Sequence, residues 1–216
     1  MSDAIRSLSV DGVDPLWTTD GKVYYQTLTF PDTVTSIGDF AYYSGGKIKK
    51  IILGDNITSI GRNAFYYCNI VEEIVFSRNL KTIGHEAFRL CGRNTLTKVD
   101  LMNTSVTSIG QNAFRNCEVL TDLLLPNTLT STVVGITGSF ATCDKLKNVT
   151  LQEGILCDLD FSVSTQFATN DLVNMLNALG TVPSGETKTF TIGATNLEKL
   201  TDEQKLIATN KGWTLA

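Results

Sequence analysis

The motif Ile-Gly-x-x-Ala-Phe recurs along the chain at a nearly constant interval. Intact copies end at Phe65, Phe88 and Phe114, a variant that ends at Tyr42 precedes them, and a degenerate copy that ends at Phe140 follows. The aromatic positions are 23 residues apart at 42, 65 and 88 and 26 residues apart at 88, 114 and 140. Repeats of about 20–50 residues are typical of solenoids, in which each repeat forms one coil that stacks on the next. The spacing therefore predicts a stack of coils.

Each repeat begins with a triplet in which two apolar residues flank a more variable one. Such alternation is the pattern of a strand with one buried face. A turn rich in Pro, Gly, Asn or Asp follows most triplets, and another apolar residue precedes the Ile-Gly step. A single repeat supplies too few apolar side chains to form a core, so the core has to form between stacked repeats. The triplets are Leu28–Phe30, Ile51–Leu53, Ile74–Phe76, Val99–Leu101, Leu123–Leu125 and Val149–Leu151.

The motif also predicts how each coil turns its corner. We expect its glycine either to adopt a positive φ or to let adjacent coils approach closely. We expect the Ala-Phe pair to begin a short helical turn on the outer side of the coil, with the aromatic ring directed into the core. The motif glycines are Gly38, Gly61, Gly84 and Gly110.

The repeat resembles the BspA-like leucine-rich repeats of bacterial surface proteins. Their unit reads approximately Leu-x-x-Ile-x-Leu-Pro-x-x-Leu-x-x-Ile-Gly-x-x-Ala-Phe-x-x-Cys, and most of these positions match in several consecutive repeats between residues 28 and 151. Residues 131–138 depart from the unit, because they carry an insertion and lose the motif isoleucine. The resemblance implies a leucine-rich-repeat solenoid with one short strand per coil. It also implies a location at the cell surface or outside the cell.

Three regions are expected in this α/β repeat protein. Residues 1–27 are predicted to form an N-terminal capping hairpin, because Asp20-Gly21 is a strong two-residue turn signal between β-rich segments. Residues 28–161 are predicted to form the solenoid, and residues 162–216 a mixed α/β cap. Caps are expected at both ends because an open solenoid end exposes its core and unpaired backbone.

The C-terminal region loses the repeat and shows helix and strand patterns instead. Apolar residues on one stripe predict an amphipathic helix over residues 164–179. Alternation predicts a strand over residues 187–192. The capping-box spacing that starts at Thr201 predicts a second helix, and a final short strand is expected over residues 213–215.

The composition argues against two classes of partner. The formal net charge is −4 and the isoelectric point is near 5.0, so nucleic acid and anionic membranes gain no electrostatic attraction. No apolar run approaches the roughly 20 residues that a membrane-spanning helix needs, so membrane insertion is not expected. Residues 1–6 lack the apolar core of a secretion signal. The chain therefore either has no standard signal or has been shortened.

Four of the five cysteines fall in one column of the repeat. Cys68, Cys91, Cys117 and Cys143 each come three residues after the motif aromatic, where the BspA-like unit also has cysteine. The need for a small, polarisable, buried residue in each coil explains why the cysteines recur at the same repeat position, so we expect reduced structural thiols. Disulfides between neighbouring coils are the alternative. A zinc site is disfavoured because no Cys-x-x-Cys spacing occurs and the chain has one histidine.

No catalytic, cofactor or metal site can be assembled from the sequence. The one histidine, His85, occupies a variable motif position that holds Arg62 and Gln111 in other repeats. Without it, no Ser-His-Asp or Cys-His pair is available. The glycine-rich fragments at residues 44–47 and 135–138 lack the spacing and the Lys-Ser/Thr ending of a P-loop. The chain is therefore predicted not to be an enzyme and to bind no cofactor.

The sheet surface is the main candidate binding site. The middle residue of each triplet should face away from the core, and Ile52, Val75 and Leu124 are large apolar residues at that position. Exposed apolar side chains rimmed by charge are typical of a protein interface. Plain β propensity, or coverage by a neighbouring subunit, would also explain them. The predicted set is Lys50, Ile52, Glu73, Val75, Lys98, Asp100, Asp122 and Leu124.

A second candidate cluster contains Tyr43, Tyr66 and Tyr67, which follow the motif aromatic on the opposite, convex side. Packing at the coil corner is the alternative explanation for these tyrosines. The absence of a catalytic set and the resemblance to BspA-like surface proteins imply a non-enzymatic recognition or adhesion protein that presents a repetitive sheet surface to a protein or a glycan. The same face could also join two copies into a homo-oligomer. The alternative function is a structural module of a larger assembly, such as a phage tail or a conjugative apparatus.

Overall fold

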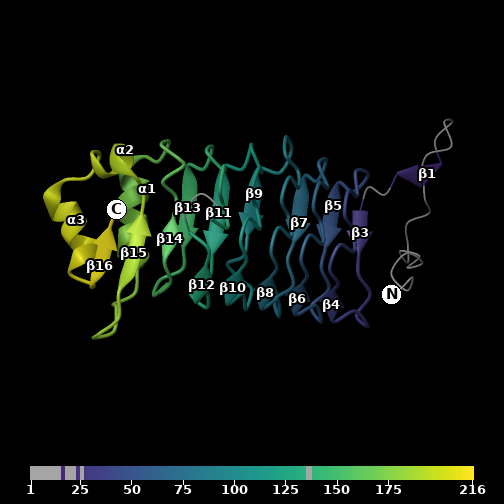
Figure 1. Ribbon diagram of the computed structural model, residues 1–216, viewed down its shortest axis with the longest axis horizontal. Coiled ribbons are helices and arrows are strands. Elements are labelled where there is room, and N and C mark those ends of the chain that lie inside the picture. Colours follow the sequence, from purple (N-terminus) through teal and green to yellow (C-terminus); the bar gives the residue numbers. More distant parts are fainter. Residues whose placement is uncertain (1–15, 18–22, 25–26, 135–137) are drawn as a thin grey trace.

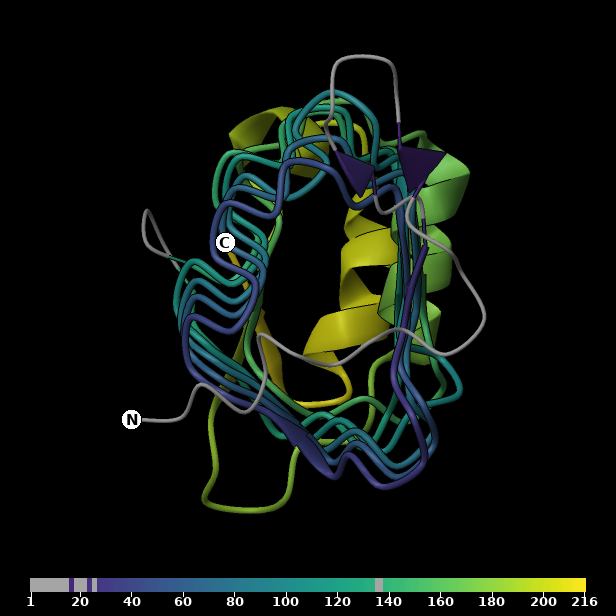
Figure 2. The same cartoon turned by 90° about the vertical axis from the view of Figure 1, so that its right-hand side faces the viewer.

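The computed structural model describes residues 16–17, 23–24, 27–134 and 138–216. The repeats wind into an elongated stack of coils, and the C-terminal elements lie across one end of the stack (Figure 1). Seen along the long axis, successive coils superpose on one another (Figure 2). The predicted leucine-rich-repeat solenoid is therefore confirmed.

Each coil carries two short strands, and the strands of successive coils run parallel in two rows. The first row arises from the apolar triplets, as predicted. In the first four coils the second row arises from the two residues before the motif glycine, and this row is an addition to the prediction. The first row contains β3 (Thr27–Thr29), β5 (Lys50–Ile52), β7 (Glu73–Val75), β9 (Lys98–Asp100), β11 (Asp122–Leu125) and β13 (Asn148–Leu151). The second row contains β4 (Ser36–Ile37), β6 (Ser59–Ile60), β8 (Thr82–Ile83), β10 (Ser108–Ile109) and β12 (Ser131–Thr132).

Side chains at equivalent repeat positions form buried columns that run through the stack. Phe65, Phe88 and Phe114 are fully buried, and neighbouring rings in this column stack nearly parallel with their centroids 5.2 Å apart. This spacing is close to the ~4.8 Å between neighbouring strands, so one ring fits each coil. Both predicted columns are confirmed. The second contains the motif isoleucines Ile60, Ile83 and Ile109.

The segment after the motif glycine is a series of tandem turns, so the predicted helical turn is wrong. A positive φ recurs every fourth residue, and in the second repeat it occurs at Asn63 (φ 54°) and Tyr67 (φ 60°). Every second N–H of this segment points along the stack. The N–H of Asn63 donates to the carbonyl of His85 at 2.9 Å, and the N–H of Tyr67 donates to the carbonyl of Arg89 at 2.9 Å. A helix would satisfy these groups internally and leave the coils unconnected.

The motif glycines allow the backbones of adjacent coils to touch. Each of the four lies in the described part of the chain and none has a positive φ, so that alternative is wrong. A Cβ added to Gly84 would lie 2.7 Å from the carbonyl carbon of Gly61. A Cβ added to Gly110 would lie 2.8 Å from the carbonyl carbon of Gly84. Side chains are not tolerated at such distances, so close approach is the reason for glycine here.

The N-terminal hairpin is present as a strand pair. Strand β1 (Leu16–Trp17) pairs antiparallel with β2 (Val23–Tyr24). The Asp20-Gly21 turn lies outside the described residues. The capping role of this hairpin and the three region boundaries stay predictions.

The C-terminal region combines a parallel sheet with three helices. Helix α1 packs against β13, which joins this region to the last coil. Helix α3 begins at the predicted capping box of Thr201, whereas the short helix α2 has no counterpart in the prediction. The helices are α1 (Thr169–Ala178), α2 (Ala194–Leu197) and α3 (Asp202–Thr209). The strands are β14 (Leu159–Asp160), β15 (Lys188–Thr191) and β16 (Trp213–Leu215).

Helix α1 begins five residues later than the predicted range of residues 164–179. The hydroxyl of Ser164 donates to the carbonyl of Leu146, and the carbonyl of Ser164 accepts from Nδ2 of Asn196 at 2.7 Å. These side-chain bonds tie residues 164–168 to the last coil and to α2. The segment therefore stays non-helical despite its apolar stripe.

Candidate partner-binding surfaces

The first row of strands is interrupted between β7 and β9. Strands β3, β5 and β7 form one three-stranded sheet and β9, β11 and β13 form another, whereas the second row is a continuous five-stranded sheet. In the other repeats with a column cysteine, the apolar residue that precedes the strand lies three positions after that cysteine. Leu96 lies five positions after Cys91. Residues 92–95 form an extra turn, in which the N–H of Thr95 donates to the carbonyl of Gly92 at 3.0 Å. We attribute the separation of β9 from β7 to this extra turn.

The interruption leaves main-chain N–H groups without an acceptor. In the second coil the N–H of Leu53, just after its strand, donates to the carbonyl of Val75 at 2.9 Å. The equivalent N–H of Phe76 has no acceptor among the described residues. Likewise the N–H of Glu72 donates to the preceding coil at 2.7 Å, whereas that of Thr97 has no acceptor in the described chain. Main-chain groups left in this way must be satisfied by solvent or by a ligand.

A surface cleft of about 340 Å³ opens at this interruption. Four residues of the predicted sheet-face set line it: Glu73 and Val75 from β7, and Lys98 and Asp100 from β9. Arg78 also lines the cleft and is absent from the predicted set. The structure thus gathers half of the predicted residues around one concave feature.

The predicted sheet face is exposed only in part. Val75 is 40% exposed, whereas Ile52 and Leu124, at the equivalent positions of β5 and β11, are half-buried. Ile52 pairs with Val75, and Asp100 pairs with Leu124, so these residues lie along one ridge that the cleft divides. Side chains with strands on both sides shield one another. Val75 borders the cleft and lacks that shielding on one side.

Charged residues of the sheet face are paired with one another. Nζ of Lys50 lies 2.8 Å from Oε2 of Glu73, and Nζ of Lys98 lies 3.0 Å from Oδ2 of Asp100. The carboxylate of Asp122 accepts a hydrogen bond at 2.8 Å from an asparagine of β13. Exposed ion pairs stabilise a fold by less than about 1 kcal/mol. A partner can therefore exchange these pairs for its own at little cost.

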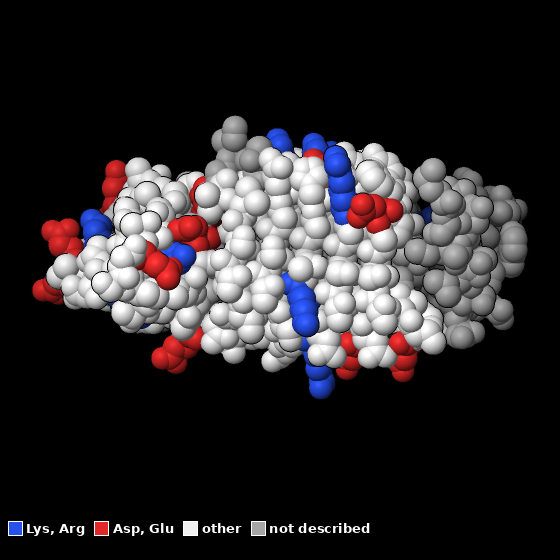
Figure 3. Space-filling view, turned by 60° about the horizontal axis from the view of Figure 1, so that its bottom comes forward, with Lys and Arg blue, Asp and Glu red and all other residues white. Residues whose placement is uncertain are grey.

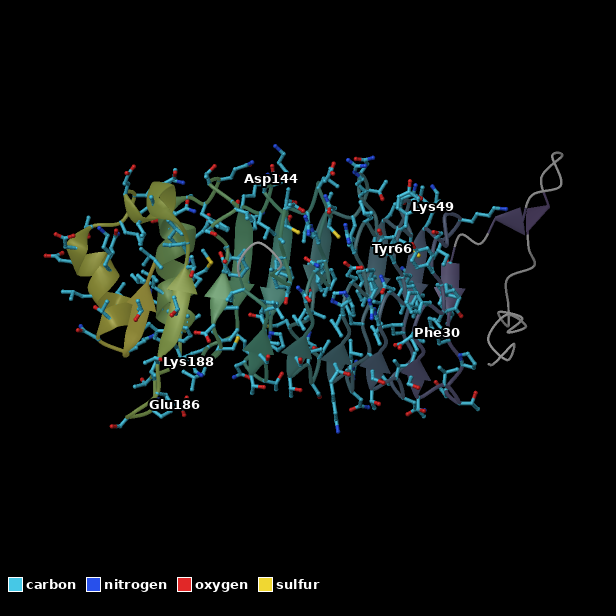
Figure 4. The ribbon with its side chains drawn as sticks, in the orientation of Figure 1. Phe30, Lys49, Tyr66, Asp144, Glu186 and Lys188 are labelled. Carbon is cyan, nitrogen blue, oxygen red and sulfur yellow. The ribbon has the colours of Figure 1, made fainter. Side chains whose placement is uncertain are left out.

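Two of the three predicted tyrosines stack on the side of the coils that carries the tandem turns. The rings of Tyr43 and Tyr66 stack with centroids 4.8 Å apart, and Tyr66 lies in the N-terminal half of the stack (Figure 4). Tyr43 and Tyr67 are exposed. Phe40 is also exposed, and its ring lies 6.0 Å from that of Tyr43. Phe40 occupies a variable motif position, so the sequence pattern does not single it out.

A profile of the BspA type leucine rich repeat region, in six copies, matches residues 21–132 and 71–164. These overlapping ranges span more than half of the chain. The chain belongs to the BspA-type leucine-rich repeat family. No curated protein matches it.

Solved structures with a similar fold come from bacteria. The leucine rich repeat protein of T. pallidum (TpLRR) has a TM-score of 0.62 and 23% identity, over 88% of this chain and 85% of that one. A leucine rich cell surface protein from Faecalibacterium prausnitzii A2-165 has a TM-score of 0.52 and 22% identity, over 77% and 40%. The pneumococcal vaccine antigen PcpA has a TM-score of 0.53 and 16% identity, over 89% and 42%. These identities show the shared fold alone, and the chain spans less than half of the last two proteins.

The cysteine column of this BspA-type protein is buried and reduced. All five cysteines are free, which removes the disulfide alternative. Sγ of Cys117 donates to the carbonyl of Cys91 at 3.2 Å, and Sγ of Cys143 donates to the carbonyl of Phe114 at 3.2 Å. Burial raises the pKa of Cys68 and of Cys143 to about 12. The thiols therefore stay protonated at neutral pH, where they are poor nucleophiles.

The remaining surface of this BspA-type protein offers no assembled metal cluster. Within the described residues, no group of three or more His, Cys, Asp or Glu side chains could hold a metal ion. Acidic and basic side chains are scattered over the face that carries the second row of strands (Figure 3). None of the helices in the described ranges is long and apolar enough to cross a membrane.

Proposed function

We propose that this protein is a non-enzymatic recognition or adhesion protein. It binds a partner protein through the sheet face, with the cleft between β7 and β9 at the centre. One observation carries the proposal: exposed Val75, unpaired main-chain N–H groups and exchangeable ion pairs all lie at the same place. An apolar centre inside a polar rim is the usual anatomy of a protein interface. The description of the Faecalibacterium relative as a cell surface protein supports a location at the cell surface.

The cleft offers contacts that a continuous sheet face does not. In a continuous sheet the backbone is saturated, so a partner meets side chains alone. Here the N–H groups of Phe76 and Thr97 are available to an acceptor on the partner. Cα atoms of β7 and β9 approach within 8 Å, whereas an inserted strand would need two strand spacings, or about 9–10 Å. The cleft therefore admits a partner's side chain but not a whole strand.

The experiment compares two matched valines. Val75 in the sheet face and Val163 outside both rows of strands are each 40% exposed. A photo-reactive residue is placed at position 75 or at position 163, the protein is irradiated on intact cells, and the captured protein is purified. Calorimetry then measures its affinity for the unlabelled wild type and for the Val75→Arg and Val163→Arg variants.

We expect capture from position 75 and not from position 163. Val75→Arg should weaken binding about tenfold or more, because a charge at a desolvated interface centre has no partner. Val163→Arg should bind as the wild type does, and both variants should keep the wild-type melting curve. Unchanged affinity of Val75→Arg would contradict the proposal. Capture of a glycan, or of a second copy of the chain, would replace the proposed partner protein with that ligand.

A further inference from the structure

Two arginines occupy equivalent positions in successive coils on the side of the tandem turns. Arg89 follows the column residue Phe88, and Arg115 follows Phe114. In the preceding coil the same position holds Tyr66, and the guanidinium of Arg89 lies over its ring at 5.6 Å. The arginines thus continue the column of stacked tyrosines that begins nearer the N-terminus.

Arg89 has a carboxylate partner from its own coil. Nη1 of Arg89 lies 2.6 Å from Oε1 of Glu86, three residues earlier in the chain. Oε2 of Glu86 accepts a hydrogen bond from Asn63 at 3.0 Å, which fixes the orientation of the carboxylate. The repeat therefore shows that a carboxylate fits beside an arginine at this position.

Arg115 has no such partner. The residue three positions earlier, which is Glu86 in the previous coil, is Asn112 here. The other nearby carboxylate, Glu118, pairs with Arg93 at 2.7 Å. Among the described residues Arg115 forms no ion pair, and its buried Nε, like that of Arg89, has no hydrogen-bond acceptor. Oδ1 of the buried Asn112 also lacks a donor.

This combination is energetically unfavourable in the isolated protein. Buried polar atoms are almost always hydrogen-bonded, and each one left unsatisfied lowers the stability of the fold. Arg89 and Arg115 occupy equivalent positions of adjacent coils, and of the two only Arg89 pairs with Glu86.

We propose that Arg115 is the binding site for a carboxylate side chain in an acidic segment of a partner protein. The incoming carboxylate takes the place that Glu86 occupies beside Arg89, and the planar guanidinium offers it two parallel N–H donors. This site lies on the tandem-turn side of the coil and does not depend on the sheet-face proposal.

Hexaglutamate is the probe, measured by calorimetry at low ionic strength with hexalysine as the opposite-charge control. The net charge of −4 disfavours polyanions in general, so binding of hexaglutamate requires a specific cationic site. We expect Arg115→Gln to weaken hexaglutamate binding about tenfold or more. Arg78→Gln and Val75→Ser should leave it unchanged, since both positions belong to the sheet-face cleft.

The Asn112→Glu variant places a carboxylate of the protein itself beside Arg115. If this variant is folded and still loses binding, misfolding does not explain the loss. It should raise the melting temperature by about 1–4 °C, because it restores the ion pair seen in the previous coil. It should also abolish hexaglutamate binding, since the site is then filled. Hexaglutamate that fails to bind the wild type, or that binds Asn112→Glu equally well, would overturn the proposal. Inorganic phosphate that binds at Arg115 as tightly as hexaglutamate would overturn the assignment to a carboxylate side chain.

Discussion

Glu86 shows at the residue scale how neighbouring coils set the chemistry of one side chain. Its side chain is 15% exposed and is held by Asn63 from the preceding coil and by Arg89 from its own. Burial on its own raises the pKa of Glu86. The hydrogen bonds from Asn63 and Arg89 and the charges of Arg89 and His85 outweigh burial, so the pKa lies below its ordinary value. The ionised form is therefore the one that stabilises the fold.

This direction fixes a pH dependence. A carboxyl with a lowered folded pKa stabilises the protein above its unfolded pKa, about 4.3 for Glu, and loses that contribution as pH falls through the folded value. Glu86→Gln should cost about 1–3 kcal/mol of unfolding free energy at neutral pH. The difference from the wild type should be smaller at pH 3 than at neutral pH, because protonation of Glu86 removes the charge that stabilises the fold. Urea titrations at the two pH values measure it.

A matched control separates this effect from general acid destabilisation. Glu186 also forms an ion pair, with Lys188 at 3.4 Å, but its side chain is 52% exposed, and it lies in the loop that projects from the C-terminal region (Figure 4). Glu186→Gln should change stability by less than about 0.5 kcal/mol at either pH. A cost of Glu86→Gln that is the same at both pH values contradicts the account of Glu86.

At the scale of the element, the tandem turns are held by contacts between coils rather than by local preference. Asparagine tolerates a positive φ, and Asn63 and Asn112 occupy such positions. Tyr67 and Leu90 adopt the same conformation without any such preference. The residue types of a single repeat therefore do not specify the turns, which is why the helical turn predicted from Ala-Phe is wrong. The repeated glycine is visible in the sequence. The structure shows that its role is to let the backbones of adjacent coils approach closely.

The glycine column gives a second test of this element. In Gly84→Ala the new methyl group would lie 2.7 Å from the carbonyl carbon of Gly61, and backbone cannot move aside as a side chain can. We expect a loss of about 1–3 kcal/mol, measured by chemical denaturation. Gly46→Ala is the control, because its Cβ would lie 3.7 Å from the nearest atom, an ordinary contact. Equal stability of the two variants would show that the coils do not pack as described.

At the scale of the whole molecule, the sequence predicts what repeats and fails to predict what breaks the repeat. The buried aromatic and isoleucine columns follow from the motif spacing alone. The cleft does not, although the extra residues between Cys91 and Leu96 are visible in the sequence. The cleft forms because the main-chain groups of β7 and β9 do not pair, and the side-chain types of the two strands do not indicate this. The sequence also shows Asn112 three residues before Arg115, where the previous repeat has Glu86 three residues before Arg89. That Arg115 lacks an ion pair becomes visible once the coils are stacked.

The central claim is that the first-row sheet is open between β7 and β9 and that this opening is the centre of the binding surface. Residue-specific amide hydrogen exchange by NMR tests it without a known partner. The N–H groups of Phe76 and Thr97 should exchange about 100-fold faster or more than those of Leu53 and Glu72, their bonded counterparts in the coil stack, because no local opening has to precede exchange. Equal protection at all four positions would mean that β7 and β9 are hydrogen-bonded. The cleft, and the proposed centre of partner binding, would then not exist.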